Sequence, residues 1–193
     1  MNIVTRVQGI LLSPSKEWTT IKSEKTSVQN LFLGYAVILA AIPAICQFIG
    51  WAVFSRWATG RMLGFVIVSY ILTLAMTFGV GFVINALAPN FGSKQSLEQA
   101  MALAVYSMTP MWVGAILYLI PAYFIYAWIM WLFGLYGLYI LYLGFAAPMI
   151  DTPKDKQLTF FIITLIVVGV GITLVRVIAQ AIFFHFSYGV VGL

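Results

Sequence analysis

The fold of this chain is decided by one apolar stretch from Glu98 to Asp151, EQAMALAVYSMTPMWVGAILYLIPAYFIYAWIMWLFGLYGLYILYLGFAAPMID. The 52 residues between those two carboxylates include no Lys, Arg, Asp, Glu or His. As one continuous helix the stretch would be about 78 Å long, whereas the hydrocarbon core of a bilayer is about 30 Å thick. We therefore predict that it crosses a membrane twice and folds back at Pro121.

The whole chain has the composition of a membrane protein. Of its 193 residues, 63% are hydrophobic and 8% are charged, and the mean hydropathy is +1.03. Soluble domains carry about 25% charged residues. The net charge of +5 does not predict nucleic-acid binding, because the ten basic residues are spread over short loops. The single Cys46 excludes an internal disulfide and a thiolate metal site, and it is expected to be a small buried hydrophobe.

Five segments are each near or above the ~20 apolar residues that a helix needs to cross a bilayer. We predict an all-α integral membrane protein, with one five-transmembrane-helix bundle formed by residues 31–193. Ser96 and Gln99 have the spacing of a capping box at the start of the third span. The predicted spans are about 31–54, 62–88, 100–120, 122–147 and 158–184.

Residues 1–30 are predicted to form a cytoplasmic, interfacial, amphipathic arm. Apolar residues recur there at helical spacing; they are Val4, Val7, Ile10 and Leu11. A second helix is expected to begin at Pro14. Trp18, Lys22 and Lys25 precede the first span and have the character of an anchor at the lipid headgroups. A docking site for a partner is the alternative interpretation of these residues.

The basic residues predict the orientation of the chain. Seven lie in the arm and in the second and fourth loops, namely Arg6, Lys16, Lys22, Lys25, Lys94, Lys154 and Lys156. The opposite side carries only Arg56 and Arg61. By the positive-inside rule, the N-terminus is expected in the cytoplasm and the C-terminus outside or in a lumen.

Several spans have one face of small or polar residues. In the first span this face holds Ala36, Ala40, Pro43, Gln47 and Gly50, and in the fourth span Gly137 and Gly144 share a side. Small residues let helices approach closely in lipid, so helix–helix packing is one interpretation of these faces. A substrate-lined groove is the other.

Arg176 is the most distinctive single residue, because it lies about 18 residues into the last span. A charge at that depth is costly unless it pairs or reaches the interface, and no span contains an Asp or Glu. Snorkelling or structural pairing is one interpretation, and a site for an anionic headgroup or solute is the other. The candidate intramembrane polar site comprises Arg176, Gln180, Thr173, Tyr106, Ser107, Pro110, Asn85 and Gln47.

The sequence does not supply the groups that an enzyme needs. A hydrolase or intramembrane protease requires a nucleophile with a base, paired carboxylates or several metal-ligating histidines. This chain has one His, one Cys and no carboxylate within a span. We therefore predict no catalytic residues, no metal and no cofactor.

From the third span onward, the residues resemble those of the Yip-one domain family. The matching segments are Ala104–Ser107 followed by Pro110, then Tyr139–Gly144, Asp151–Lys156 and an early SPSKEW at residues 13–18. The resemblance extends over about residues 8–190. The family's Tyr-Gly-Tyr-Ser signature is altered, because Ala104 and Val105 replace its first Tyr and its Gly.

The resemblance implies five spans with a cytoplasmic N-terminus. Eukaryotic members bind Rab-type GTPases through a long N-terminal region, and binding of that kind is not expected for an arm of about 30 residues without the Asp-Leu-x-Gly-Pro motif. A bacterial inner membrane is the expected location. The leading functional hypothesis is a membrane-organising or adaptor role through binding of membrane lipids, of a membrane-protein partner or of a second copy. The alternative is a small transporter or channel with a site near Arg176, between the third and fifth spans.

Overall fold

The computed structural model describes the backbone of residues 2–24, 26–54, 59–120, 123–146 and 149–190. Within those ranges, side chains are described except for residues 54, 59–61, 123–127, 146, 172 and 174–190. All regular secondary structure in the described residues is helical. The predicted all-α fold class is therefore confirmed, and the expected corner at Pro121 lies outside the described residues.

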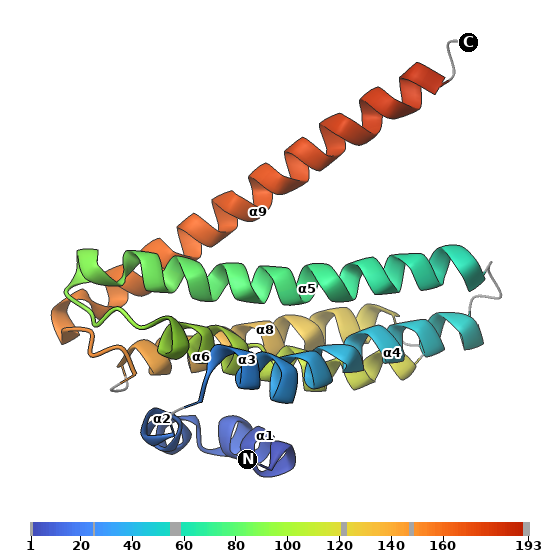
Figure 1. Ribbon diagram of the computed structural model, residues 1–193. Helices are drawn as coiled ribbons and strands as arrows, with labels where there is room; N and C mark the ends of the chain where they lie inside the picture. Colours follow the sequence, from blue (N-terminus) through green and yellow to red (C-terminus); the bar gives the residue numbers. More distant parts are fainter. Residues whose placement is uncertain (1, 25, 55–58, 121–122, 147–148, 191–193) are drawn as a thin grey trace.

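The arm consists of two short helices, α1 (Ile3–Leu12) and α2 (Pro14–Ser23). The side chain of Asn2 caps α1 by accepting a hydrogen bond from the backbone N–H of Val4 at 3.0 Å. The second helix begins at Pro14 as predicted. Both helices lie across the long direction of the bundle, beside the half that contains the α5–α6 and α8–α9 connections (Figure 1). We call this half the arm end.

The first two spans are nearly continuous helices. The first consists of α3 (Val28–Leu31), a π-helical turn (Phe32–Ala36) and α4 (Val37–Phe54), so the arm ends slightly earlier than residue 30. The Ser27 hydroxyl caps this span by accepting from the Asn30 N–H at 3.3 Å. The second consists of α5 (Thr59–Leu87) and a 3-10 turn, η2 (Ala88–Phe91).

The third span is broken and central. It consists of α6 (Leu97–Ser107), α7 (Thr109–Gly114) and a 3-10 segment, η3 (Ala115–Leu119). The Ser96 half of the predicted capping box is confirmed, because the Ser96 hydroxyl accepts from the Gln99 N–H at 3.4 Å. The Gln99 half is not, because its side-chain oxygen has no hydrogen-bond partner in the described structure. The break falls before Pro110, which has no N–H to continue the preceding helix. Of the most apolar part of this span, 72% is buried, against 17–28% in the other three candidate spans.

The remaining helices are α8 (Tyr123–Ala146) and α9 (Lys154–Val190). Within the described residues, four helices are long and apolar enough to cross a membrane: Val28–Val53, Met62–Phe91, Leu97–Leu119 and Trp128–Phe145. The predicted fifth span, residues 158–184, lies within α9. Helix α9 packs against α5 and α8 near its start and then diverges from the bundle (Figure 1). Its role as a fifth span stays a prediction.

Small residues bring the helices together, which confirms the packing interpretation at several positions. Ala36 and Ala40 are buried, and the backbone of Gly50 lies against the carbonyl oxygen of Tyr118. A Cβ atom on Gly137 would lie 2.7 Å from the Ser107 carbonyl oxygen, so only glycine allows α8 to approach α6 this closely. The same close packing occurs at Gly144, which lies against Leu103 and Trp18.

Candidate functional site

Trp18 attaches the arm to the bundle. Its side chain is 0% exposed, and its indole N–H donates a hydrogen bond to the Ile140 carbonyl oxygen at 3.1 Å. A second link is the Tyr136 hydroxyl, which donates to the Leu11 carbonyl oxygen at 2.7 Å. The expectation that Trp18 lies at the lipid headgroups is therefore corrected. The glycine at position 144 leaves space for the indole against α8, so the residue is buried in protein.

A buried arginine holds the two arm helices together. The Arg6 side chain is 4% exposed and forms ion pairs with Glu17 and Glu24, whose side chains are 19% and 38% exposed. Its guanidinium also lies over the ring of Tyr106, 5.7 Å from the ring centroid. An arginine buried beside apolar spans requires such partners, since an unpaired charge there is strongly destabilising.

The sequence analysis treated Arg6 only as an orientation signal and so missed this cluster. One signal was available: Arg6 lies one helical turn before Ile10, on the side of α1 that is buried. A charge on the apolar face of a short helix indicates a buried ion pair.

Lys22 forms a further, more exposed link. Its ammonium group lies 2.6 Å from a carboxylate oxygen of Asp151, in the α8–α9 connection. These side chains are 29% and 51% exposed, so the pair contributes little stability and is screened by salt. Lys22 is thus tied to protein at the arm end, and Lys25 lies outside the described residues.

On the arm side, the polar groups at the break in the third span form hydrogen bonds with one another or with the backbone. The hydroxyls of Tyr35 and Thr109 are 2.9 Å apart and share a hydrogen bond, while the Ser107 hydroxyl donates to the Leu103 carbonyl oxygen at 2.6 Å. The rings of Tyr35 and Tyr106 pack edge to face with centroids 4.8 Å apart. Buried hydrogen bonds of this kind favour one arrangement of the broken helix.

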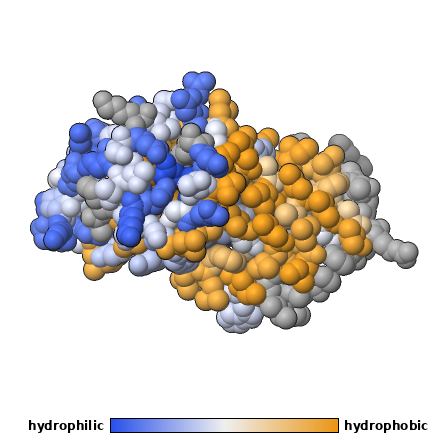
Figure 2. All heavy atoms as spheres, turned by 90° about the horizontal axis from the view of Figure 1, so that it is seen from below, coloured by the Kyte–Doolittle hydropathy of each residue, from blue (hydrophilic) through white to orange (hydrophobic). Residues whose placement is uncertain are grey.

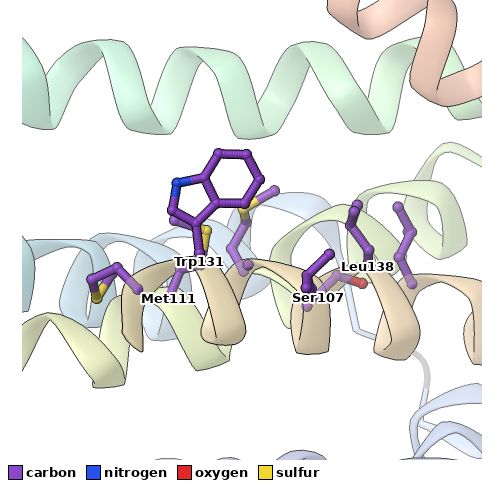
Figure 3. Close-up of a pocket in the computed structure, with 10 residues that line it drawn as sticks. Ser107, Met111, Trp131 and Leu138 are labelled. Carbon is purple, nitrogen blue, oxygen red and sulfur yellow. The ribbon is translucent and has the colours of Figure 1, made fainter. Parts of the chain in front are cut away.

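The opposite side of the break is an apolar groove of about 530 Å³ between α8 and the region where α6 meets α7. Its described lining residues are Ser107, Met108, Met111, Met130, Trp131, Gly134, Leu135, Gly137, Leu138 and Leu141. Figure 3 shows the indole of Trp131 standing out from α8 above the groove, with Met111 and Leu138 along it. Ser107 is the one hydroxyl residue among them, and its hydroxyl is already bonded within α6.

The outer surface of the bundle is strongly apolar. Trp128 and Trp131 are 74% and 72% exposed, and many leucine, isoleucine and valine side chains on α4, α5 and α8 are exposed as well. In Figure 2, hydrophilic residues gather at the arm end, while hydrophobic residues cover most of the rest of that face. Such a continuous apolar exterior fits a surface in contact with lipid.

Among the described side chains, the structure does not gather the predicted polar residues into one site. Tyr106, Ser107 and Pro110 are buried together at the break. Gln47 lines a separate cavity between α4 and α5. Asn85 lies on α5, where its side-chain oxygen is buried without a hydrogen-bond partner in the described structure. Thr173 is exposed on α9, with its hydroxyl bonded to the Gly169 carbonyl oxygen at 2.8 Å.

Arg176 and Gln180 lie in the part of α9 whose side chains are not described. That part diverges from the third span in Figure 1. Among the described side chains, no group of three or more His, Cys, Asp or Glu residues could hold a metal ion.

The long apolar helices and the apolar exterior define a multi-pass α-helical membrane protein. The model of the Yip1 domain matches residues 9–176, and the chain therefore belongs to the Yip1 domain family, as its resemblance to the Yip-one proteins implied.

Two relatives of this chain carry the same name. The inner membrane protein YohC of Escherichia coli strain K12 is 26% identical over 197 residues, which cover 96% of this chain and 98% of the relative. The protein of that name from E. coli O6:H1 matches equally well. These matches confirm the predicted inner-membrane location. No solved structure matches this chain.

Proposed function

We propose that this chain is a non-enzymatic membrane-organising protein that holds an acyl chain of a membrane lipid in the groove between α7 and α8. The observation that carries the proposal is the groove itself, which is large, apolar and bordered by exposed Trp131. Flexible methionine side chains, three of which line it, adapt to irregular apolar ligands. The broken third span forms one wall of the groove, and the arm packs against the opposite side of that span.

We also propose that the arm end faces the cytoplasm. Lys22 lies in the arm, Lys94 in the α5–α6 connection and Lys154 at the start of α9, all at this end, in agreement with the positive-inside rule. These charges favour anionic lipid headgroups of the inner leaflet as neighbours of the arm. Single cysteines introduced at Gln8 and at Lys154 would both be labelled by an impermeant thiol reagent only after the cytoplasmic side is opened. Labelling of intact cells would contradict this orientation.

The groove can be tested by filling it. A Cβ atom on Gly134 would meet only Met111 Sδ, at 3.8 Å, so Gly134→Leu places a larger side chain in the groove without disturbing the backbone. Gly79 on α5 has nothing within 4 Å of such a Cβ atom, so Gly79→Leu is the matched control on a lipid-facing helix.

The measurement is crosslinking of a phospholipid with a photoactivatable acyl chain to the protein in native lipid. We expect Gly134→Leu to reduce crosslinking to peptides that contain Met130 and Trp131 several-fold, and Gly79→Leu to leave it unchanged. Equal crosslinking in both variants would overturn the proposal.

The transport alternative would require Arg176 beside the third span. Helix α9 makes its main described contacts with α5, α8 and η2, so the geometry favours lipid binding over a site between the third and fifth spans. Solute flux through liposomes that is lost in Arg176→Leu, with folding unchanged, would reverse this preference.

A further inference from the structure

A second cavity of about 250 Å³ lies between α4, α5 and η3, apart from the lipid groove. Its lining differs in kind from that of the groove, because half of its described residues carry a polar group. These residues are Gln47, Ser69, Tyr70, Thr73 and Tyr118, and the apolar ones are Ala40, Pro43, Ala44, Phe65 and Val66. Gln47 belongs to the small and polar face that the sequence predicts for the first span.

The cavity lies within the depth of the membrane. Gln47 is six residues before the end of the candidate span Val28–Val53, and Ser69 is seven residues after the start of Met62–Phe91. At 1.5 Å per residue, both are about 10 Å from the ends of their spans. The hydrocarbon core extends about 15 Å on each side of its centre, so these polar groups are at hydrocarbon depth.

Two of the polar side chains have no hydrogen-bond partner among the described residues. Tyr70 donates to the Val37 carbonyl oxygen at 2.9 Å, and Thr73 donates to the Ser69 carbonyl oxygen at 2.8 Å. The Gln47 amide and the Ser69 hydroxyl make no such bond, and both line the cavity. An unpaired amide at this depth is costly, because lipid offers no partner. A polar molecule in the cavity would supply the missing hydrogen bonds.

We propose that this cavity binds an uncharged group bearing hydroxyls or amides, through the Gln47 amide and the Ser69 hydroxyl. No Lys, Arg, Asp, Glu or His is among the described lining residues, which disfavours an ion. The volume corresponds to roughly eight water molecules at about 30 Å³ each, enough for a group the size of glycerol. The source is either a free neutral solute or the glycerol head of a neutral lipid.

Thiol reactivity tests this assignment. In a Cys46→Ala background, Ser69→Cys places a thiol in the cavity and keeps a weak hydrogen-bond donor and acceptor in place of the hydroxyl. Val68→Cys places a thiol on the adjacent residue, whose side chain is 56% exposed on the outer surface of α5. Only the thiolate reacts, and it forms only where polar surroundings stabilise it. We expect Ser69→Cys to react with a small methanethiosulfonate roughly tenfold faster than Val68→Cys. Equal, slow reaction of the two would overturn the proposal.

Two probes then identify the source of the ligand. Glycerol is added to protein in phosphatidylcholine nanodiscs, and dioleoylglycerol is incorporated into a second set of nanodiscs. Protection of Ser69→Cys by glycerol indicates a free solute, and protection by dioleoylglycerol alone indicates a lipid head. A cysteine at exposed Gln8 controls for general slowing of the reaction. Reaction of Ser69→Cys without protection by either probe would overturn the proposal.

Gln47→Leu provides the specificity control. This substitution preserves the approximate volume and removes both the donor and the acceptor. In the Ser69→Cys background it should abolish protection, while thermal unfolding in detergent shows that the fold is intact. Protection that persists without the Gln47 amide would contradict its assigned role. Crosslinking at the α7–α8 groove is measured in the same variants, so failure here is distinguishable from failure of the lipid-groove proposal.

Discussion

The two sides of the broken third span differ sharply in how they are covered. On the arm side, Trp18 and Arg6 are buried and bonded to named partners. On the groove side, Trp131 is exposed and the lining offers almost no hydrogen-bonding group. The third span is therefore covered on one side by buried, hydrogen-bonded side chains, including Tyr35, which shares a hydrogen bond with Thr109. On the other side it is left open to apolar molecules. In this arrangement, the contacts that stabilise the helix lie on the side away from the groove, so the groove itself can consist of apolar side chains alone.

The largest expected effect compares the two tryptophans. Trp18→Ala removes a fully buried indole and its hydrogen bond, and we expect a loss of about 3–5 kcal/mol in the free energy of unfolding. Trp131→Ala removes an exposed side chain and should cost less than about 1 kcal/mol. Equilibrium unfolding in detergent measures both. Equal losses would show that the arm side is not the stabilising side.

The next effect concerns the ion cluster. Arg6→Met leaves Glu17 and Glu24 without their guanidinium, and we expect the arm to be destabilised by about 2–3 kcal/mol. This loss is smaller than the about 3–5 kcal/mol usual for a fully buried pair, because Glu24 is partly exposed. Faster amide hydrogen exchange in α1 and α2 is the measurement. Lys16→Met, on an exposed position of α2, is the control and should change little.

Two glycines of α8 compare the two sides on a smaller scale. Gly137→Ala would bring a methyl group to 2.7 Å from the Ser107 carbonyl oxygen, and it should cost about 1–3 kcal/mol through overpacking. Gly134→Ala faces the groove with room to spare and should be neutral or slightly stabilising, because alanine favours helix. Thermal unfolding of the two variants measures the difference in stability between them. A larger loss at Gly134 would contradict the assigned packing.

The smallest expected effect is at the break itself. Tyr35→Phe removes the hydroxyl that shares a hydrogen bond with Thr109, and we expect a loss of about 1 kcal/mol. Thr109→Val should cost a similar amount, and the double variant should lose less than the sum of the two. A double-mutant cycle in detergent measures this coupling. Strict additivity would indicate that the two hydroxyls do not act as a pair.

Much of the fold could be predicted from the sequence because the relevant signals are local. The start of the third span, its cap at Ser96 and the helix that begins at Pro14 agree with the structure. The apolar stretch after Glu98 is too long for one crossing of a bilayer, so the chain was expected to cross the membrane twice there. The close approach of α8 to α6 was also foreseeable from Gly137 and Gly144. Each of these signals is carried by a single segment of the chain.

The candidate sites were much less predictable. The grouping of Gln47 with Asn85 and Ser107 assumed that polar residues of different spans meet, but Gln47 lies in its own cavity between α4 and α5. The apolar groove beside α8 could not be recognised in the sequence, because its methionines and leucines are of the same type as residues facing lipid. Arg6 and Glu24 are 18 positions apart, and their contact depends on how α1 and α2 fold together.

Apolar length and loop charge are sufficient to specify a helical membrane protein, its approximate spans and the expected side of its arm. These properties follow from the mismatch between helix length and bilayer thickness, which needs no knowledge of neighbours. The burial of Trp18, the pairing of Arg6 and the positions of the two cavities were decided only by tertiary packing. Each depends on which helix faces meet, and in lipid that choice is made by small residues and a few long-range hydrogen bonds.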